Sequence, residues 1–448
     1  LAPPLIPPGL SHLDYSALAM SPQLTLQSPL QLPPSEVPSY LEQLWLNDQP
    51  GNTGAKTFSL LVWQPAWVEQ QLVRTGQIDG PIIGSQSQEL IQAARQAVTE
   101  GDLPHSTPPL DSSVAAVLAQ RKGNQHGEDL RGQHIDAAIS ALEPRRLITL
   151  APTLEKGHDL ETLVAAYCPL PEEGGGNSAC GDVVVLRGDH HALTDGLGIL
   201  QPLLPAELPS WVWWNGSLDE APELLERLAV TPRRLVIDTA LGDPHRCIEL
   251  LKAHVEAGRA VNDLNWLRLR TWREHLAMVF DPPHRRNALS HVDQLEIDVE
   301  GHHPVQGLLL AAWIADRLGW QLQATQTIKG EGIAAEFRRT DGTTVQFRLM
   351  PVPMGQPSIH PGQIVGVRLI CKPDAQLEHA VCVILCAESG GCMRLEAGGM
   401  ASMELIEEVV PMQVASVEMD VARLLAGGHN TTTPLLAAAA PLAAKLLS

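Results

Sequence analysis

The stretch Trp211-Val212-Trp213-Trp214-Asn215-Gly216 places three tryptophans within four positions. Seven of the ten Trp in the chain lie between Trp211 and Trp320, against three Tyr and four Phe overall. A short, continuous apolar run predicts a buried strand. Tryptophan also carries much of the binding energy at protein–protein contacts, so this segment indicates either a core strand or a partner surface.

Alternation along the predicted strand would place Trp211 and Trp213 on one face and Trp214 on the other. Core packing explains most of the seven tryptophans, and one or two remain for a partner surface. We take Trp213 and Trp214 as the partner-binding candidates of this strand. The surrounding sequence contains no complete catalytic or cofactor motif, which favours a partner-binding protein over an enzyme.

Outward from this strand, apolar strands alternate with helices. The predicted strands are 57–63, 146–150, 164–168, 182–186, 211–214 and 234–238. The predicted helices are 86–98, 193–204, 220–228 and 246–257. Such alternation is typical of a parallel sheet with helices on both faces. Residues 51–285 are therefore predicted to form an α/β domain with a mainly parallel sheet.

A further helix is predicted to begin at Asp263, whose carboxylate can cap it. Its apolar side chains recur at helical spacing and form one predicted buried face: Trp266, Leu269, Trp272, Leu276 and Val279 or Phe280. Arg270 and Glu274 stand four residues apart beside that face. Arg270 and Arg273 are the other two candidates for binding a partner.

The pair Pro282-Pro283 ends this helix and marks a domain boundary. Beyond it, the sequence predicts one helix at 304–318 and strands at 295–299, 321–328, 333–338, 345–350, 366–371, 380–386 and 392–396. Asp341-Gly342 and Ser389-Gly390-Gly391 supply hairpin turns. Residues 286–448 are predicted to form an α+β domain with an antiparallel sheet. Residues 1–50, rich in Pro, Ser and Leu, are predicted to be an extended arm with one short helix at 40–46.

Composition limits the partners and the compartment. The chain has 448 residues and a formal net charge of −20, which argues against nucleic acid or anionic membranes as partners. We find neither a leader sequence nor an apolar run of the ~18 residues that a spanning helix needs. Seven cysteines, an odd number, indicate a reducing compartment rather than a disulfide framework. We therefore expect a cytoplasmic protein.

Three local patterns are similar to known sites but lack a required feature. Gly54-Ala55-Lys56-Thr57 lacks the glycine before the lysine of a phosphate-binding loop and precedes a strand rather than a helix. Gly176-Asn177-Ser178-Ala179-Cys180 lacks the second glycine of a nucleophile elbow. The pairs His190-His191 and His302-His303 have no metal-ligand spacing around them. We therefore expect no catalytic residue, no cofactor and no metal.

Four of the seven cysteines, Cys371, Cys382, Cys386 and Cys392, fall within 22 positions. Cys386 and Cys392 flank a predicted hairpin centred near Ser389, where symmetric pairing would set them opposite each other. Facing residues of an antiparallel pair have Cα separations of about 4.5–5.5 Å, within or close to disulfide range. A bond near a loop tip would be a reducible switch. The alternative is that these cysteines are small core residues, and Cys371 and Cys382 remain further redox candidates.

Several stretches in chain order carry a family resemblance. They are Pro202-Leu203-Leu204-Pro205 with Leu208-Pro209, the Trp211–Gly216 segment, Arg233-Arg234-Leu235-Val236-Ile237-Asp238, Asp263-Leu264-Asn265-Trp266 with Arg268-Leu269, Trp272-Arg273-Glu274, Phe280-Asp281, and Ala312-Trp313 with Leu318-Gly319-Trp320. Together they resemble the OpcA family of glucose-6-phosphate dehydrogenase assembly proteins, in its cyanobacterial form. The resemblance covers residues 180–320, and the first 50 residues carry no recognisable signature.

This resemblance implies a non-catalytic protein that binds glucose-6-phosphate dehydrogenase, favours its active oligomer and raises its activity at low substrate. It also implies that thioredoxin acts on cysteines of the protein in cyanobacteria, which would suit Cys386 and Cys392. Two alternatives stay open. One is an α/β enzyme acting on a sugar phosphate, with Asp238, Arg233 or Arg273 as polar site groups. The other is a passive scaffold without redox control.

Overall fold

The computed structural model describes residues 24–26, 30–46, 58–63, 146–152, 159–169, 181–204, 208–230, 233–328, 332–353, 362–371, 381–388, 392–399, 402–411, 417–426 and 432–448. The helix predicted at 86–98 and the glycine-containing patterns at 54–57 and 176–180 lie outside the described residues. The chain forms two compact units, residues 1–211 and 212–448, and each is described by itself.

Parallel strands form the centre of the first unit. β3 (Ser59–Trp63) pairs with β4 (Arg146–Pro152), and β4 pairs with β6 (Gly181–Gly188), both in parallel. β3 is buried throughout and β6 nearly so, as expected for strands covered on both faces. At the start of β4 and β6, the register partners Arg146 and Asp182 form a bidentate ion pair at 2.6 and 2.8 Å.

The rest of the sheet in the first unit is antiparallel. β5 (Glu161–Pro169) runs antiparallel to β6, and both β1 (Leu24–Leu26) and β2 (Leu30–Leu32) run antiparallel to β5. The described part of the predicted N-terminal arm therefore contains two short strands. It also contains α1 (Val37–Leu46), where the sequence predicts a helix at 40–46.

The single helix predicted at 193–204 is three short pieces. They are α6 (His190–Asp195), the 3₁₀ turn η1 (Gly196–Ile199) and α7 (Leu200–Leu203). Asp189 caps α6 by accepting a hydrogen bond from the backbone N–H of Ala192 at 2.8 Å. Two glycines lie in η1, where the α-helix is interrupted. Glycine is costly inside an α-helix.

The tryptophan-rich strand, β7 (Ser210–Trp214), spans the boundary between the units and is confirmed as a core strand. Trp213 and Trp214 are 0% exposed and Trp211 is 2% exposed. The Trp214 indole donates to the carbonyl of Ser217 at 3.0 Å. This burial contradicts the partner-surface role predicted for Trp213 and Trp214, because a covered side chain offers no area to a partner.

The second unit continues with two βα steps. β8 (Arg234–Ile237) neighbours β7 and pairs in parallel with β9 (Val261–Asp263). α8 (Pro222–Leu228) connects β7 to β8, and α9 (Pro244–Glu256) connects β8 to β9. The three-residue strand β9 was not predicted, because so short a segment carries no periodic signal.

The helix predicted from Asp263 is divided at Leu269 into α10 (Leu264–Arg268) and α11 (Arg270–Val279). Its predicted buried face is confirmed, since each member is at most 5% exposed: Trp266, Leu269, Trp272, Leu276, Val279 and Phe280. After Pro282 the chain forms α12 (Pro283–Ala288) and the 3₁₀ turn η2 (Leu289–His291).

A second sheet follows, with its strands in the order β11-β12-β13-β10-β14-β15-β16-β17. The strands are β10 (Val292–Glu300), β11 (Gln321–Ile328), β12 (Gly332–Arg338), β13 (Thr344–Val352), β14 (Ile364–Cys371), β15 (Val381–Glu388), β16 (Cys392–Gly399) and β17 (Ser402–Pro411). The predicted antiparallel sheet is mixed, because β10 and β13 pair in parallel. After β10 the chain forms a helix and two further strands. It then forms β13, which lies beside β10 and runs in the same direction.

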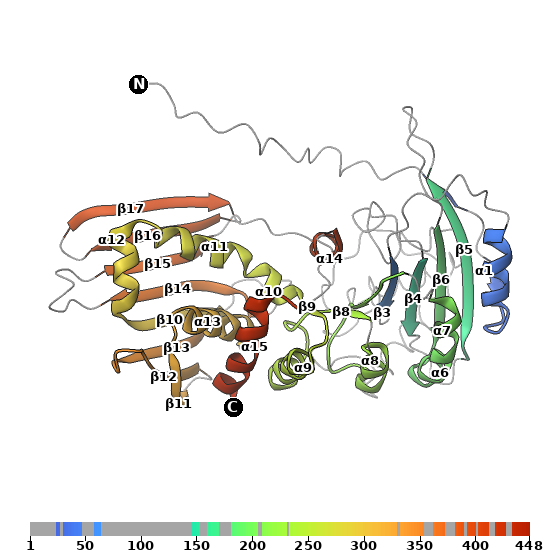
Figure 1. Cartoon of the computed structure of the whole chain (residues 1–448), viewed down its shortest axis with the longest axis horizontal. Helices are drawn as coiled ribbons and strands as arrows, with labels where there is room; N and C mark the ends of the chain where they lie inside the picture. The colour runs from blue at the N-terminus through green and yellow to red at the C-terminus, as the bar shows by residue number, and fades with distance from the viewer. Residues whose placement is uncertain are drawn as a thin grey trace, which may run out of the picture. The chain divides into compact units, whose positions relative to one another are not determined.

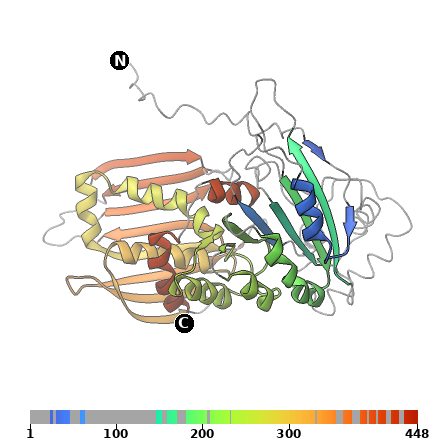
Figure 2. The same cartoon turned by 45° about the vertical axis from the view of Figure 1, so that its right-hand side comes forward.

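Helices cover one face of this second sheet. α13 (Val305–Arg317) packs so closely that a Cβ atom added at Gly307 would lie 2.6 Å from Leu349 and 2.9 Å from Val299. α14 (Val417–Ala426) and α15 (Pro434–Leu447) complete the chain. Figure 1 and Figure 2 both show α11, α12 and α13 on the same side of the sheet.

The predicted fold class is therefore supported at the level of the sheets. A mostly parallel α/β sheet precedes a mostly antiparallel one. The predicted domain boundary near residue 285 lies between the strands of the two sheets. It stays a prediction about domains, since the compact units divide at residue 211.

Candidate functional site

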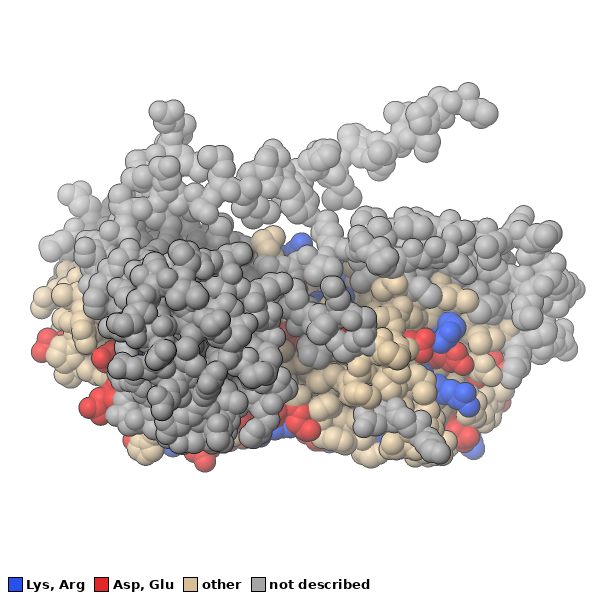
Figure 3. All heavy atoms as spheres, turned by 180° about the vertical axis from the view of Figure 1, so that it is seen from behind, with Lys and Arg blue, Asp and Glu red and all other residues tan. Residues whose placement is uncertain are grey.

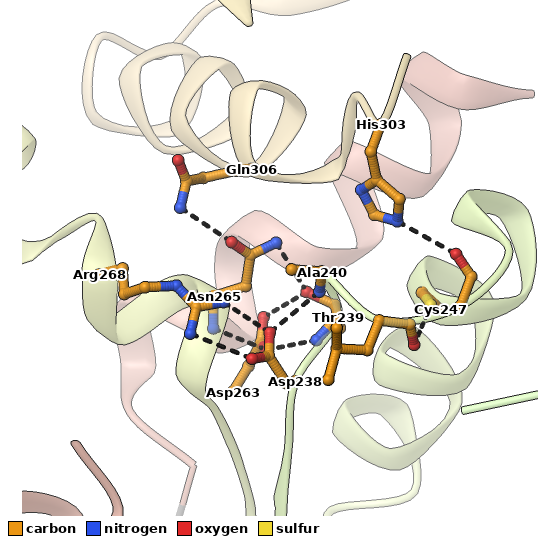
Figure 4. Close-up of polar contacts among 11 residues, drawn as sticks. Asp238, Thr239, Ala240, Cys247, Asp263, Asn265, Arg268, His303 and Gln306 are labelled. Atoms are coloured by element: carbon orange, nitrogen blue, oxygen red, sulfur yellow. Dashed lines mark hydrogen bonds and ion pairs between the residues drawn. The ribbon is translucent and has the colours of Figure 1, made fainter. Parts of the chain in front are cut away.

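A cluster of buried polar side chains lies where β8 and β9 end. Asp238 and Thr239 directly follow β8, and Asp263 is the last residue of β9. The carboxyl ends of parallel strands meet at one edge of a sheet, where α/β proteins place ligand sites. All three residues are at most 2% exposed, and Figure 4 shows their side chains close together.

Asp263 joins two segments of backbone. Its Oδ1 accepts hydrogen bonds from the backbone N–H of Thr239 at 3.0 Å and of Asn265 at 3.1 Å. Its Oδ2 accepts from the Thr239 hydroxyl at 2.8 Å. The bond from Asn265 is the predicted cap of α10. One carboxylate therefore ties the end of β8 to the start of α10.

Asp238 is held by a bidentate ion pair with Arg268 of α10. Its two oxygens accept from the Arg268 guanidinium at 3.0 and 2.6 Å. The backbone N–H of Ala240 also donates to Asp238 at 3.0 Å. Two parallel, charge-assisted bonds are a strong form of hydrogen bonding. Without Arg268, a carboxylate that is 2% exposed would lose its counter-charge.

Two amides extend the cluster toward the second sheet. Asn265 donates to the Thr239 hydroxyl at 3.3 Å and accepts from Gln306 of α13 at 2.8 Å. Gln306 in turn accepts from the backbone N–H of Ile364 at 2.9 Å. The sequence predicts no part in such a cluster for Arg268, Asn265 or Gln306. The available signal was the pair of aspartates at neighbouring strand ends.

Burial dominates the electrostatics of the cluster. Burial raises the pKa of Asp263 to about 6, reinforced by Asp238 and opposed by the hydrogen bonds that Asp263 accepts and by Arg268. Burial also raises the pKa of Asp420 in α14 to about 6, against the attraction of Arg268 and Arg423. Near neutral pH, both carboxyls therefore ionise at a cost that the arginines offset in part.

Four backbone donors in and next to the turn between β8 and α9 are occupied by carboxylates. These N–H groups donate at 2.6–3.0 Å to carboxylates of the chain itself: Thr239 to Asp263, Ala240 to Asp238, Asp243 to Asp219 and Arg246 to Asp243. In nucleotide-binding folds, free N–H groups at this turn and the helix that follows bind a phosphate. Here carboxylates take those positions, and their charge repels an anion.

His303 contacts the same turn, with its Nε2 at 3.2 Å from the carbonyl of Gly242, and burial lowers its pKa. Among the described residues, no group of three or more His, Cys, Asp or Glu side chains is arranged to hold a metal ion. In the described part of the chain, no helix is long and apolar enough to cross a membrane.

The arginines named from the sequence have separate environments. The Arg270 side chain is 70% exposed and pairs with Glu274 at 2.7 Å. Arg273 lies over the Trp266 ring, 3.8 Å from its centroid, and burial lowers its pKa to about 10. Arg233 donates to the carbonyl of Leu228 at 3.1 Å. Arg270 is therefore open to a partner, whereas Arg273 covers a tryptophan.

The expected facing of Cys386 and Cys392 is wrong by two residues. Cys386 of β15 pairs in register with Arg394 of β16, and Cys392 pairs with Glu388. The pairing of β15 with β16 is therefore centred one residue later than predicted. Diagonal neighbours of this kind have Cα atoms about 7–8 Å apart, beyond the usual disulfide range.

The other two candidate cysteines lie on neighbouring strands. Cys371 of β14 is 0% exposed and therefore belongs to the core. Cys382 of β15 pairs in register with Ile370 of β14. The role of either cysteine in redox control stays a prediction.

Two family models match the chain. The glucose-6-phosphate dehydrogenase subunit N-terminal domain matches residues 136–253, and the C-terminal domain of the same subunit matches residues 259–440. The two domains occur here in their expected order. The fold and these matches place the chain in the class of glucose-6-phosphate dehydrogenase subunit proteins.

Three cyanobacterial relatives refine this class. A protein of Synechococcus elongatus named as an OxPP cycle protein, OpcA, is 34% identical over 406 residues, which cover 87% of this chain and 90% of the relative. Proteins of the same name from Synechocystis and Nostoc punctiforme are each 29% identical, over 90% of this chain and 89% and 90% of their own lengths. The chain belongs to the OpcA family.

Among solved structures, a 3-ketoreductase of Actinomadura kijaniata in complex with NADP is 11% identical. It covers 54% of this chain and 77% of its own, with a TM-score of 0.35. A similarity at this level supports no conclusion about function.

Proposed function

We propose that this chain is a non-catalytic partner of glucose-6-phosphate dehydrogenase, located in the cytoplasm. It favours the active oligomer of the enzyme and raises its activity at low glucose 6-phosphate. It thereby controls entry into the oxidative pentose phosphate pathway. Membership of the OpcA family supports the choice of partner.

The occupied turn after β8 is the observation that carries the non-catalytic role. A phosphate or dinucleotide would have to displace the carboxylates that the backbone donors already bind. Asp238 is likewise bound to Arg268 by two hydrogen bonds. Groups engaged in this way stabilise the fold and are poorly placed to bind a substrate.

Activation follows from differential binding. A partner shifts an equilibrium only by the difference between its affinities for the two states of the enzyme. A tenfold gain in the apparent substrate affinity of the dehydrogenase requires about 1.4 kcal/mol of coupling. The chain therefore needs only a modest preference for the active conformation.

Redox control acts through Cys386 and Cys392 in this proposal. In the oxidising direction, an external disulfide takes two electrons and two protons from the two thiols, which become a disulfide while the external disulfide becomes a dithiol. A thioredoxin dithiol reverses this step, restoring both thiols and becoming a disulfide itself. Because the two residues are diagonal neighbours, the bond requires β16 to slip along β15. A slip of two residues keeps every side chain on its own face, and β17, which pairs with β16, has to move with it.

The deciding experiment measures dehydrogenase activity at low glucose 6-phosphate with and without this protein. The protein is first oxidised and then reduced by thioredoxin. We expect activation by the oxidised form and its loss on reduction. Cys386→Ser should activate weakly and ignore thioredoxin. A Cys386→Ser protein that activates fully and still responds to thioredoxin would contradict the redox pair, and indifference of the wild type to reduction would favour a passive scaffold.

The rival hypothesis is an α/β enzyme acting on a sugar phosphate through Asp238, Arg233 or Arg273. Each of these groups already has a partner within the chain: Arg268, the Leu228 carbonyl and the Trp266 ring. Turnover of glucose 6-phosphate or 6-phosphogluconolactone by the chain alone would establish this alternative. We expect none.

A further inference from the structure

One face of the second sheet is free of the described helices. On β13, Phe347 and Leu349 are buried on the side that α13 covers. Arg348, between them, therefore points to the opposite side and is exposed. Figure 3 shows the molecule from behind, and basic and acidic side chains gather there on the described surface. We call this side the helix-free face; its charged residues on β10, β12, β13 and β14 include Glu296, Asp298, Glu336, Arg338, Arg348 and Arg368.

The carboxylates at the centre of the helix-free face are already bound. Arg368 of β14 contacts Glu296 at 3.0 Å and Asp298 at 2.6 Å, both on the neighbouring strand β10. Glu336 of β12 accepts a hydrogen bond from Gln346 at 3.2 Å. The Arg368 pairs hold β10 and β14 together, and the Gln346 amide orients the Glu336 carboxylate without neutralising its charge.

Two arginines on the same face have no such counter-charge. Arg338 at the end of β12 and Arg348 on β13 are exposed, and neither forms an ion pair with any residue that the structure describes. Arg348 lies opposite Glu296 in register, but Glu296 is bound to Arg368. The named residues of this face sum to zero, three arginines against three carboxylates, and the guanidinium groups of Arg338 and Arg348 are the ones left open to a carboxylate of a partner.

We infer that the helix-free face is the docking surface for the dehydrogenase, and that Arg338 and Arg348 bind carboxylates on the surface of that enzyme. This inference rests on the proposed function and names the surface that performs it. A second copy of the chain is a poorer occupant. Glu296 and Asp298 of its own helix-free face are occupied by Arg368, and two chains of charge −20 repel each other.

The size and composition of the face suit a protein interface. Eight strands spaced about 4.8 Å apart span about 34 Å, and strands of this length extend about 25 Å, which gives an area on the order of 800 Å². A stable interface of standard size buries about 800 Å² on each partner. Strands β12, β13 and β14 each contain an arginine, and none of the strands β10 to β14 contains a lysine. Protein interfaces favour arginine over lysine.

The proposed redox pair belongs to the same sheet. Cys386 is the register partner of Gly366, which is the register partner of Asp298 on β10. A slip of β16 along β15 would therefore change the surface next to the charged residues of the helix-free face. This continuity provides a route from oxidation to docking.

The test measures binding of the full chain to purified glucose-6-phosphate dehydrogenase by titration calorimetry at two salt concentrations. We expect Arg338→Glu with Arg348→Glu to weaken binding on the order of tenfold or more, and most at low salt. Arg317→Glu is the matched control, because it reverses an exposed arginine at the end of α13. It should bind as the wild type does, and melting curves should show that all variants are folded.

The possible outcomes separate the two proposals. If the wild type does not bind the dehydrogenase, both the proposed function and this inference fail. If the wild type and the double variant bind equally, the function stands and the helix-free face is not the docking surface. Loss of binding in Arg270→Glu alone would assign docking to α11. Sedimentation showing a dimer of this chain that Arg348→Glu dissociates would assign the face to a second copy.

Discussion

The second unit contains two sets of charged side chains that differ in their surroundings. At the ends of β8 and β9, the Arg268 side chain is 12% exposed and Asp238 is 3% exposed, and the two bind each other. On the helix-free face, Arg338 and Arg348 are exposed and pair with no described residue. Burial therefore decides the role of an arginine. A buried arginine must be matched within the chain, whereas an exposed one is available to a partner.

The largest expected effect is on the buried pair. Arg268→Met should lower the free energy of unfolding by about 3–5 kcal/mol, because it leaves the Asp238 carboxylate buried and uncompensated. Urea unfolding measures this change. The double variant Arg268→Met with Asp238→Asn should recover part of the loss, since the stranded charge is gone. A loss below about 1 kcal/mol in the single variant would refute the assigned role of the pair.

A pH series tests the buried side of the comparison further. Burial raises the pKa of Asp420 to about 6 in the folded chain, from about 4 when unfolded. The folded state therefore holds this proton more tightly, and the resulting stabilisation is present below pH ~4 and is lost as the pH rises through about 6. Asp420→Asn removes this titration.

We therefore expect Asp420→Asn to gain stability relative to the wild type as the pH rises from about 4 to about 7. The gain should be on the order of 2 kcal/mol. Urea unfolding of both proteins across this range provides the measurement. A stability difference that stays constant with pH would show that Asp420 titrates normally.

A smaller effect is expected at Arg273, whose burial is intermediate between that of the two sets. Arg273→Leu should lower the free energy of unfolding by about 1 kcal/mol, because it removes the cation from the Trp266 ring. Thermal melting measures this change. Arg273→Lys should lose less, since it keeps a cation. Weakened dehydrogenase binding without a change in melting would instead make Arg273 a contact residue.

The smallest effect on folding is expected on the helix-free face. Arg348→Ala should change the free energy of unfolding by no more than about 0.5 kcal/mol, because its side chain is exposed and makes no described ion pair. Urea unfolding beside the binding titration separates the two properties. Destabilisation by more than about 1 kcal/mol would place Arg348 with the buried set and remove the contrast.

Local patterns predicted much of the fold. The buried face of α10 and α11 follows from apolar residues at helical spacing, and all its members are buried. The cap at Asp263 and the ion pair between Arg270 and Glu274 also follow from short spacings. These features depend on neighbours within about one helical turn, so the sequence contains the information that they need.

Errors arose where distant segments decide the outcome. The pairing of β10 with β13 depends on the path of the chain through α13 and two strands. The offset between Cys386 and Cys392 depends on the register in which β15 and β16 pair. The predicted partner-surface role of Trp213 and Trp214 is wrong because the sequence of a strand does not show which of its faces will be covered.

Residue order and local spacing are sufficient to predict most strands and helices, the capping of α10 and the family to which the chain belongs. Those properties depend on residue order and short-range spacing. The tertiary structure alone decided that Asp238 meets Arg268, that the turn after β8 is closed by carboxylates, and that Arg348 faces away from the helices. The physical reason is that burial and charge pairing are set by residues far apart in the chain, which only folding brings together.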